Sequence, residues 1–67
     1  MPESDTELTE REREVAALIA DGASSKEAGR VLGISPRTVE LHRAHIMEKL
    51  GARNAADLVR IVLTRSL

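Results

Sequence analysis

The chain has 67 residues, a formal net charge of −1 and no cysteine, tryptophan, tyrosine or phenylalanine. A chain of this length forms one domain, and an aliphatic core of this size leaves only about 3–5 kcal/mol of net stability. The absence of cysteine excludes disulfides, thiolate metal sites and cysteine nucleophiles. It suits a reducing compartment, so we expect a cytoplasmic protein without a cofactor. The sequence shows no signal-peptide pattern and no apolar run near the roughly 20 residues of a membrane span.

The charges are unevenly distributed along the chain. Residues 1–33 carry four basic and eight acidic side chains, whereas residues 34–67 carry six basic and three acidic ones together with both histidines. The net charge argues against a nucleic-acid ligand, but this division would allow one basic face to meet phosphate while the other end repels it. Ordinary scatter of charge over a solvated surface would explain the same numbers equally well.

The N-terminal part predicts a tail followed by a helix. Residues 1–7 are polar, acidic and without pattern, so we expect a flexible tail or linker end before a domain at 8–67. Thr9 is a good N-cap, and Glu12 at the third helical position completes a capping box. Gly22 suits the left-handed residue that ends such a helix.

A second, short helix is expected to begin near Ser24 or Ser25 and to stop at Gly33. Its apolar stripe is predicted to be Ala28, Val31 and Leu32, buried against the neighbouring helices.

Two further helices have clear limits. The third has Ser35 as its N-cap and Pro36 at its first position, where a missing N–H costs nothing, and it continues to about Leu50. The fourth begins at Asn54, with Asp57 favoured near the positive end of the helix dipole, and runs to about residue 65. No segment alternates with period two, so the predicted fold is all-α, a four-helix bundle.

Only three residues, Gly33, Ile34 and Ser35, separate the second and third helices. A turn of this length, often with glycine, joins the two helices of a DNA-reading helix-turn-helix, and Ile34 is expected to fill the core between them. A plain helical hairpin, which is common, would give the same pattern.

The third helix divides into two faces at 100° per residue. Val39, Ile46 and Leu50 cluster as a buried stripe. The opposite face carries these residues: Arg37, Glu40, Leu41, Ala44 and Glu48, with Thr38 and His45 at its border. An apolar side chain beside polar ones, on a capped helix after a tight turn, suits contact with a DNA major groove.

Specific base and phosphate contacts can be assigned to this face. Leu41 is suited to a thymine methyl group, and Glu40 to cytosine N4. Residues placed to hold phosphate are Arg37, Thr38, His42, Arg43 and Lys49. Glu40 and Glu48 oppose this interpretation, because phosphate repels them unless they pair with bases or cations. An i,i+3 salt bridge between Glu40 and Arg43 would be the ordinary alternative.

We expect no metal site and no enzyme activity. His42 and His45 are spaced i,i+3, but two ligands without a nearby carboxylate or thiol set rarely bind a metal ion. The serines and threonines are placed as caps, and no general base or orienting acid is organised around any of them.

Three stretches identify a family. Leu8–Glu12 (LTERE), residues 35–43 (SPRTVELHR) and residues 47–51 (MEKLG) occur in order. Together they strongly resemble the LuxR/GerE-type DNA-binding domain, and most closely the output domain of FixJ-like response regulators. The resemblance covers Leu8 to about Leu63. It implies a bacterial transcription regulator with a helix-turn-helix over residues 25–44 whose third helix enters the major groove.

The resemblance also implies roles for individual residues. Base-reading positions are Glu40, Leu41 and Ala44. Phosphate-binding positions are Ser25, Lys26, Thr38, His42 and Lys49. Glu12 resembles the family's buried acidic residue, with Arg43 as its partner or as a phosphate clamp. The fourth helix mediates dimerisation, for which we predict the stripe Leu58, Ile61 and Arg65, while the stripe Val59, Val62 and Leu63 would face the core. The implied partners are palindromic double-stranded DNA, a second copy of the chain and, as a candidate, RNA polymerase.

The second helix departs from the family pattern Asn-Lys-Glu-Ile-Ala, because this chain has Ser-Lys-Glu-Ala-Gly at residues 25–29. Ala28 is smaller than the usual core residue, and Gly29 lowers helix propensity by roughly 0.5–1 kcal/mol.

Two rival functions remain open from sequence. A sigma-factor-like promoter-reading region uses the same helix-turn-helix. A protein-interaction bundle without DNA binding would suit the net charge and the exposed acids of the third helix.

Overall fold

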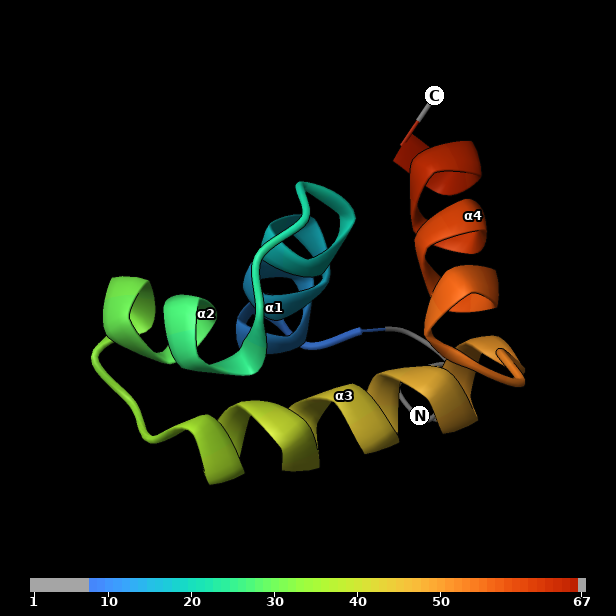
Figure 1. Ribbon diagram of the computed structural model, residues 1–67. Helices are drawn as coiled ribbons and strands as arrows, with labels where there is room; N and C mark the ends of the chain where they lie inside the picture. The colour runs from blue at the N-terminus through green and yellow to red at the C-terminus, as the bar shows by residue number, and fades with distance from the viewer. Residues whose placement is uncertain (1–7, 67) are drawn as a thin grey trace.

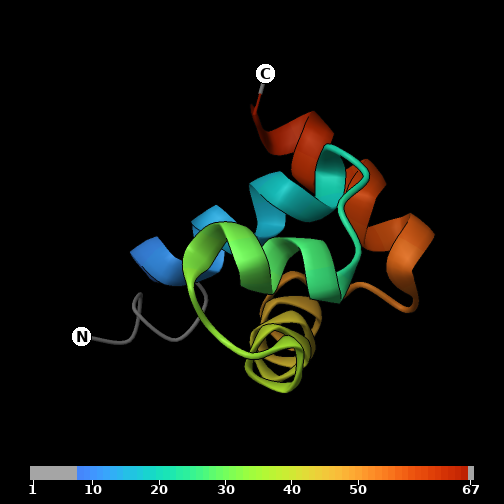
Figure 2. The same ribbon diagram turned by 60° about the vertical axis from the view of Figure 1, so that its left-hand side comes forward.

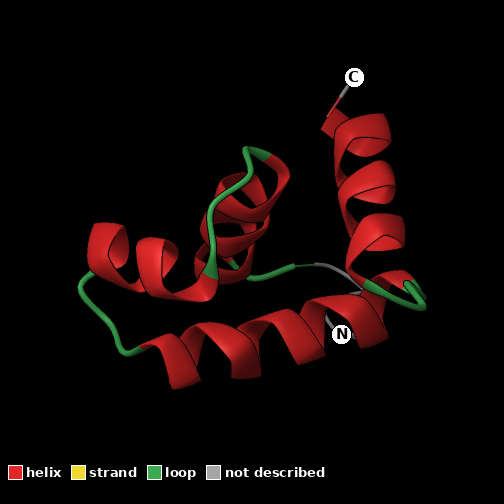
Figure 3. Cartoon of the chain, in the orientation of Figure 1, coloured by secondary structure: helices red, strands yellow, loops and turns green. Residues whose placement is uncertain are grey.

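The computed structural model describes residues 8–66, with side chains described as far as Thr64. Within this range lie helices α1 (Glu10–Ala20), α2 (Ser25–Leu32), α3 (Pro36–Leu50) and α4 (Ala55–Ser66), and no strand (Figures 1 and 3). The predicted all-α fold is therefore confirmed. The expected tail at residues 1–7 lies outside the described residues and stays a prediction.

Reciprocal side-chain hydrogen bonds define the starts of α1 and α2. The Glu12 backbone N–H donates to Thr9 Oγ1 at 3.1 Å, and the Thr9 backbone N–H donates to Glu12 Oε1 at 2.9 Å. This is the predicted capping box. Ser24 and Glu27 form a second one with the same two distances, which the sequence analysis had not assigned. Each pair satisfies backbone N–H groups that a helix terminus otherwise leaves without partners.

The limits of α3 and the start of α4 are also the expected ones. Ser35 Oγ accepts from the Thr38 N–H at 3.1 Å, and Pro36 is the first residue of α3. Gly51, at φ 72°, ends the helix in the left-handed conformation that glycine adopts without strain. Asn54 Oδ1 accepts from the Asp57 N–H at 2.8 Å and so begins α4.

Helix α3 runs along one side of the molecule (Figure 1). Helix α2 lies over the first half of α3, and α4 stands at a steep angle near its far end. Seen nearly along the α3 axis, the other three helices all lie on one side of it (Figure 2). Helix α1 contacts each of the other three helices. One long side of α3 is therefore left without a neighbouring helix.

The core draws on all four helices. Its buried residues are Val15, Ala16, Ile19, Ala28, Val39, Ile46 and Leu58. Ile34 in the turn is half-buried and packs against this cluster, as predicted.

The prediction that Val31 is buried is wrong, because 66% of Val31 is exposed. Helix α2 turns Gly29 and Ala28 inward. At 100° per residue, Val31 lies about 160° around the helix from Gly29.

Candidate nucleic-acid interface

The uncovered side of α3 carries the residues that the helical periodicity places outward. Arg37, Glu40 and Ala44 are exposed, and 56% of Leu41 is exposed. On the opposite side, Val39 and Ile46 are fully buried. The helix therefore offers an apolar centre, Leu41 and Ala44, between polar side chains. Hereafter the reading face means Glu40, Leu41 and Ala44.

The turn before α3 is fixed by backbone hydrogen bonds to α2. The carbonyl oxygen of Gly29 accepts from the N–H of Gly33 and, at 2.9 Å, from the N–H of Ile34. Gly33 takes the left-handed conformation at φ 73°, which reverses the chain direction. With Ile34 packed on the core, this short turn sets the direction in which α3 leaves α2.

The N-terminal end of α3 presents polar groups to solvent. The hydroxyls of Ser35 and Thr38 lie 2.9 Å apart, and the first backbone N–H groups of the helix give this end a partial positive charge. Of the other predicted phosphate-binding residues, Lys26 and Arg37 are exposed, and Ser25, His42 and Arg43 are half-buried.

Lys49 has a structural partner. Its Nζ donates to Glu12 Oε1 at 2.8 Å, with side-chain exposures of 20% for Lys49 and 6% for Glu12. The prediction that Glu12 pairs with a basic group is thus realised by Lys49 and not by Arg43. Burial alone would raise the pKa of the Glu12 carboxyl, but the hydrogen bonds from Lys49 and from the Thr9 N–H outweigh it and hold that pKa below its ordinary value.

The predicted dimer stripe is corrected at Leu58, which is fully buried in the core. Leu63 lies about 140° around α4 from Leu58 and is 51% exposed. Ile61 is half-buried, and the side chain of Arg65 lies outside the described part. Val59 and Val62 are half-buried and pack against the core. Leu58 therefore belongs to the core and Leu63 to the surface, so neither stripe of α4 lies wholly inward or wholly outward.

Asp57 organises the α3–α4 connection, and sequence reasoning assigned it only a helix-dipole role. It accepts from Arg60 Nη2 at 2.7 Å and from the Arg53 N–H at 3.1 Å. These hydrogen bonds, that from Arg60 most of all, lower the pKa of the Asp57 carboxyl. The i,i+3 spacing of Asp57 and Arg60 was the signal that could have revealed the pair.

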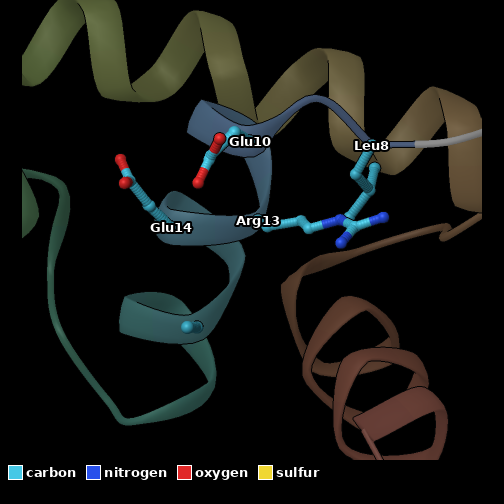
Figure 4. A pocket seen from close by; sticks show the side chains of 5 residues that line it. Leu8, Glu10, Arg13 and Glu14 are labelled. Carbon is cyan, nitrogen blue, oxygen red and sulfur yellow. The ribbon is translucent and has the colours of Figure 1, made fainter.

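The described surface also has a pocket to which α3 contributes no lining residue. This shallow pocket beside α1 is lined by charges of both signs. The Arg13 side chain extends toward Leu8, whereas Glu10 and Glu14 lie on the side away from Leu8 (Figure 4). Among the described residues, no three metal-ligating side chains come together, and none of the helices is long and apolar enough to cross a membrane.

A short, hydrogen-bonded turn between α2 and α3, with one side of α3 left open, is the arrangement found in helix-turn-helix DNA-binding domains. Residues 6–62 match the family model described as bacterial regulatory proteins, luxR family. The chain belongs to this family, and it is a DNA-binding domain of a transcriptional regulator.

Curated relatives agree with this assignment. The transcriptional regulatory protein UhpA of Escherichia coli is 53% identical over 79% of this chain, which covers 27% of UhpA. FixJ of Rhizobium meliloti is 46% identical over 84% of this chain, covering 28% of FixJ. The response regulatory protein YgeK of Escherichia coli is 45% identical over 90% of the chain, covering 41% of YgeK. The chain thus spans about a quarter of the length of UhpA and FixJ. No solved structure matches.

Proposed function

We propose that this domain binds double-stranded DNA sequence-specifically, with α3 in the major groove and two copies on a palindromic operator. The observation that carries the proposal is the reading face: a capped helix, held by a short turn, that leaves Glu40, Leu41 and Ala44 open beside Arg37. An α-helix fits the major groove, and its exposed side chains then meet base edges.

The reading face has the chemistry to distinguish base pairs. The Leu41 side chain would contact a thymine methyl group, and the Glu40 carboxylate would accept a hydrogen bond from cytosine N4. Ala44 is small, which would let the helix approach the bases closely. Since Glu40 is repelled by phosphate, its favourable position is over a base and not over the backbone.

Positively charged and hydroxyl groups around this face would hold the phosphates. Lys26 and Arg37 are exposed and are the first candidates. Ser25, Thr38, His42 and Arg43 would add contacts from half-buried positions at the edges of the face. Such contacts fix the register of a protein on the duplex but carry no sequence information. Lys49 would reach phosphate only in competition with Glu12.

Dimerisation would use the solvent-facing part of α4 around Leu63, which is 51% exposed. Two copies would then read half-sites one helical turn apart, about 34–36 Å. In a cytoplasmic bacterial regulator, surfaces away from the duplex would remain free for RNA polymerase.

Selection from random duplexes tests the proposal directly. The unmodified chain should enrich a palindromic motif, and Leu41→Ala or Glu40→Ala should alter the enriched sequence at single positions of each half-site. Failure to enrich any motif would contradict sequence-specific binding.

Two measurements separate the rival functions. Sedimentation on the selected duplex should show two copies of the chain, whereas a sigma-factor-like region would bind as one. Affinity should fall steeply as salt rises, because phosphate contacts release counterions. Salt-independent or undetectable binding would favour a protein-interaction bundle.

A further inference from the structure

Gly29 occupies a position on α2 where a side chain does not fit. A Cβ built on Gly29 would lie 2.5 Å from the carbonyl oxygen of Ile34, and 3.3 Å from both the carbonyl carbon of Ser35 and the nitrogen of Pro36. All three atoms belong to the backbone, so none can move away by a simple side-chain rotation. The family pattern to which this sequence is similar has alanine here, and the turn of this chain lies too close to α2 to accommodate one.

The turn is also bound to α2 at the same residue. The carbonyl oxygen of Gly29 accepts from the N–H groups of Gly33 and Ile34. The carbonyl group of Gly29 therefore holds the turn through hydrogen bonds, and the absence of a side chain at Gly29 leaves space for the turn to pack against α2. The N-terminal end of α3 follows immediately, because Pro36 is both a neighbour of Gly29 and the first residue of the helix.

A displacement at Gly29 would reach the reading face. To reach even the tight contact range of 3.0–3.4 Å, the Ile34 carbonyl would have to retreat from 2.5 Å by about half an ångström or more. Val39 and Ile46 anchor α3 in the core, so a push on its first turn would tilt the helix and not simply translate it. Hydrogen bonds to base edges tolerate only a few tenths of an ångström in length.

We propose that Gly29 is a positioning residue, which sets the angle at which α3 presents Glu40, Leu41 and Ala44 and thereby the sequence preference of the domain. This inference rests on the proposed DNA binding.

The test compares Gly29→Ala with Gly22→Ala. Gly22 has φ +97° and no atom within 4 Å of a built Cβ, so its substitution strains the backbone without touching the turn before α3. Residual dipolar couplings in the free protein report the orientation of α3 relative to α1. Selection from random duplexes reports the sequence preference. Affinities for the selected duplex and for an unrelated duplex, measured at one salt concentration, report how strong that preference is.

Gly29→Ala should reorient α3 and change the selected motif. It should weaken binding to the original motif roughly tenfold, which corresponds to the loss of about one good base contact. Binding to the unrelated duplex should be nearly unchanged. Gly22→Ala should keep both the orientation and the motif. The proposal is overturned if Gly29→Ala leaves the orientation unchanged, if the orientation changes while the motif is retained, or if Gly22→Ala changes the motif equally.

A second variant covers the case in which Gly29→Ala does not fold. Insertion of one glycine after Gly33 shifts the turn without adding a side chain at position 29, and it should also change the selected motif. Retention of the original motif by this variant would refute the proposal. If the unmodified chain selects no motif at all, DNA binding as proposed fails, while the dipolar couplings still report whether Gly29 positions α3.

Discussion

Glu12 and Lys49, 37 positions apart in sequence, meet through a 2.8 Å hydrogen bond between Lys49 Nζ and Glu12 Oε1. The same oxygen accepts from the backbone N–H of Thr9 at 2.9 Å. One carboxylate therefore caps the start of α1 and ties that helix to the last turn of α3. A cap and a tertiary contact depend on a single side chain.

Glu12→Gln should lower the free energy of unfolding by about 1–3 kcal/mol, because it removes the negative charge that the half-buried Lys49 ammonium meets at 2.8 Å. Urea titrations of Glu12→Gln, Lys49→Met and the double variant would measure the coupling between the two side chains. The matched control is Glu14→Gln, which breaks the exposed 3.2 Å pair with Arg11 and should cost no more than about 0.5 kcal/mol. Equal losses for positions 12 and 14 would contradict the structural importance of the buried pair.

Stability should fall as the solution becomes acidic. The folded-state pKa of Glu12 lies below its ordinary value of 4.5, so the folded state binds fewer protons than the unfolded one. The stabilisation is therefore complete above that value and is lost as the pH falls through the folded-state pKa. Thermal unfolding between pH 7 and pH 3 should show this loss, and Glu12→Gln should flatten the profile. Asp57 adds a loss of the same sign. A Glu12→Gln profile as steep as that of the unmodified chain would exclude Glu12 as its source.

The two leucines of α4 should respond differently to truncation. Leu58→Ala removes a fully buried side chain and should cost about 2–5 kcal/mol, enough to unfold much of so small a domain. Leu63→Ala should change monomer stability by no more than about 0.5 kcal/mol, because its side chain is half exposed. Circular dichroism and sedimentation on the selected duplex measure the two effects. Leu63→Ala should reduce binding of the second copy, and unaltered two-copy binding would move the dimer contact elsewhere.

Arg37 should contribute affinity without sequence information. Arg37→Ala should weaken binding to all duplexes alike and reduce the slope of log affinity against log salt by about one, the signature of one lost phosphate contact. The matched control is Arg11→Ala, since Arg11 is exposed on α1, in the acidic half of the chain. A change in the selected motif on removing Arg37 would instead assign it a base contact.

Local signals made most of the fold predictable. Ser35 with Pro36, Asn54 with Asp57, and glycines 33 and 51 each set a helix limit through interactions within a few residues, and the structure has these limits where expected. The open and buried sides of α3 were also predictable, because helical periodicity alone places Leu41 opposite Ile46.

The features that sequence missed depend on contacts between distant segments. Lys49, and not Arg43, reaches Glu12 because the start of α1 lies against the end of α3. The periodicity of a single helix gives no information on where another helix packs against it. Leu58 is buried although it lies on the predicted dimer stripe, because side chains from both apolar stripes of α4 pack in or against the core. Val31 is exposed because α2 presents two small residues, Ala28 and Gly29, to its neighbours. A search for large hydrophobic residues at helical spacing does not detect a packed face made of small residues.

The separation of the two sides of α3 bears on how such a domain can change its target. The exposed side chains of Glu40, Leu41 and Ala44 are not part of the buried core that holds the helix in place. Substitutions there remove little buried surface and so leave folding nearly intact, in contrast to changes at Val39 or Ile46. With the proposed base contacts on this side, new operator specificities would be accessible by single replacements on one scaffold.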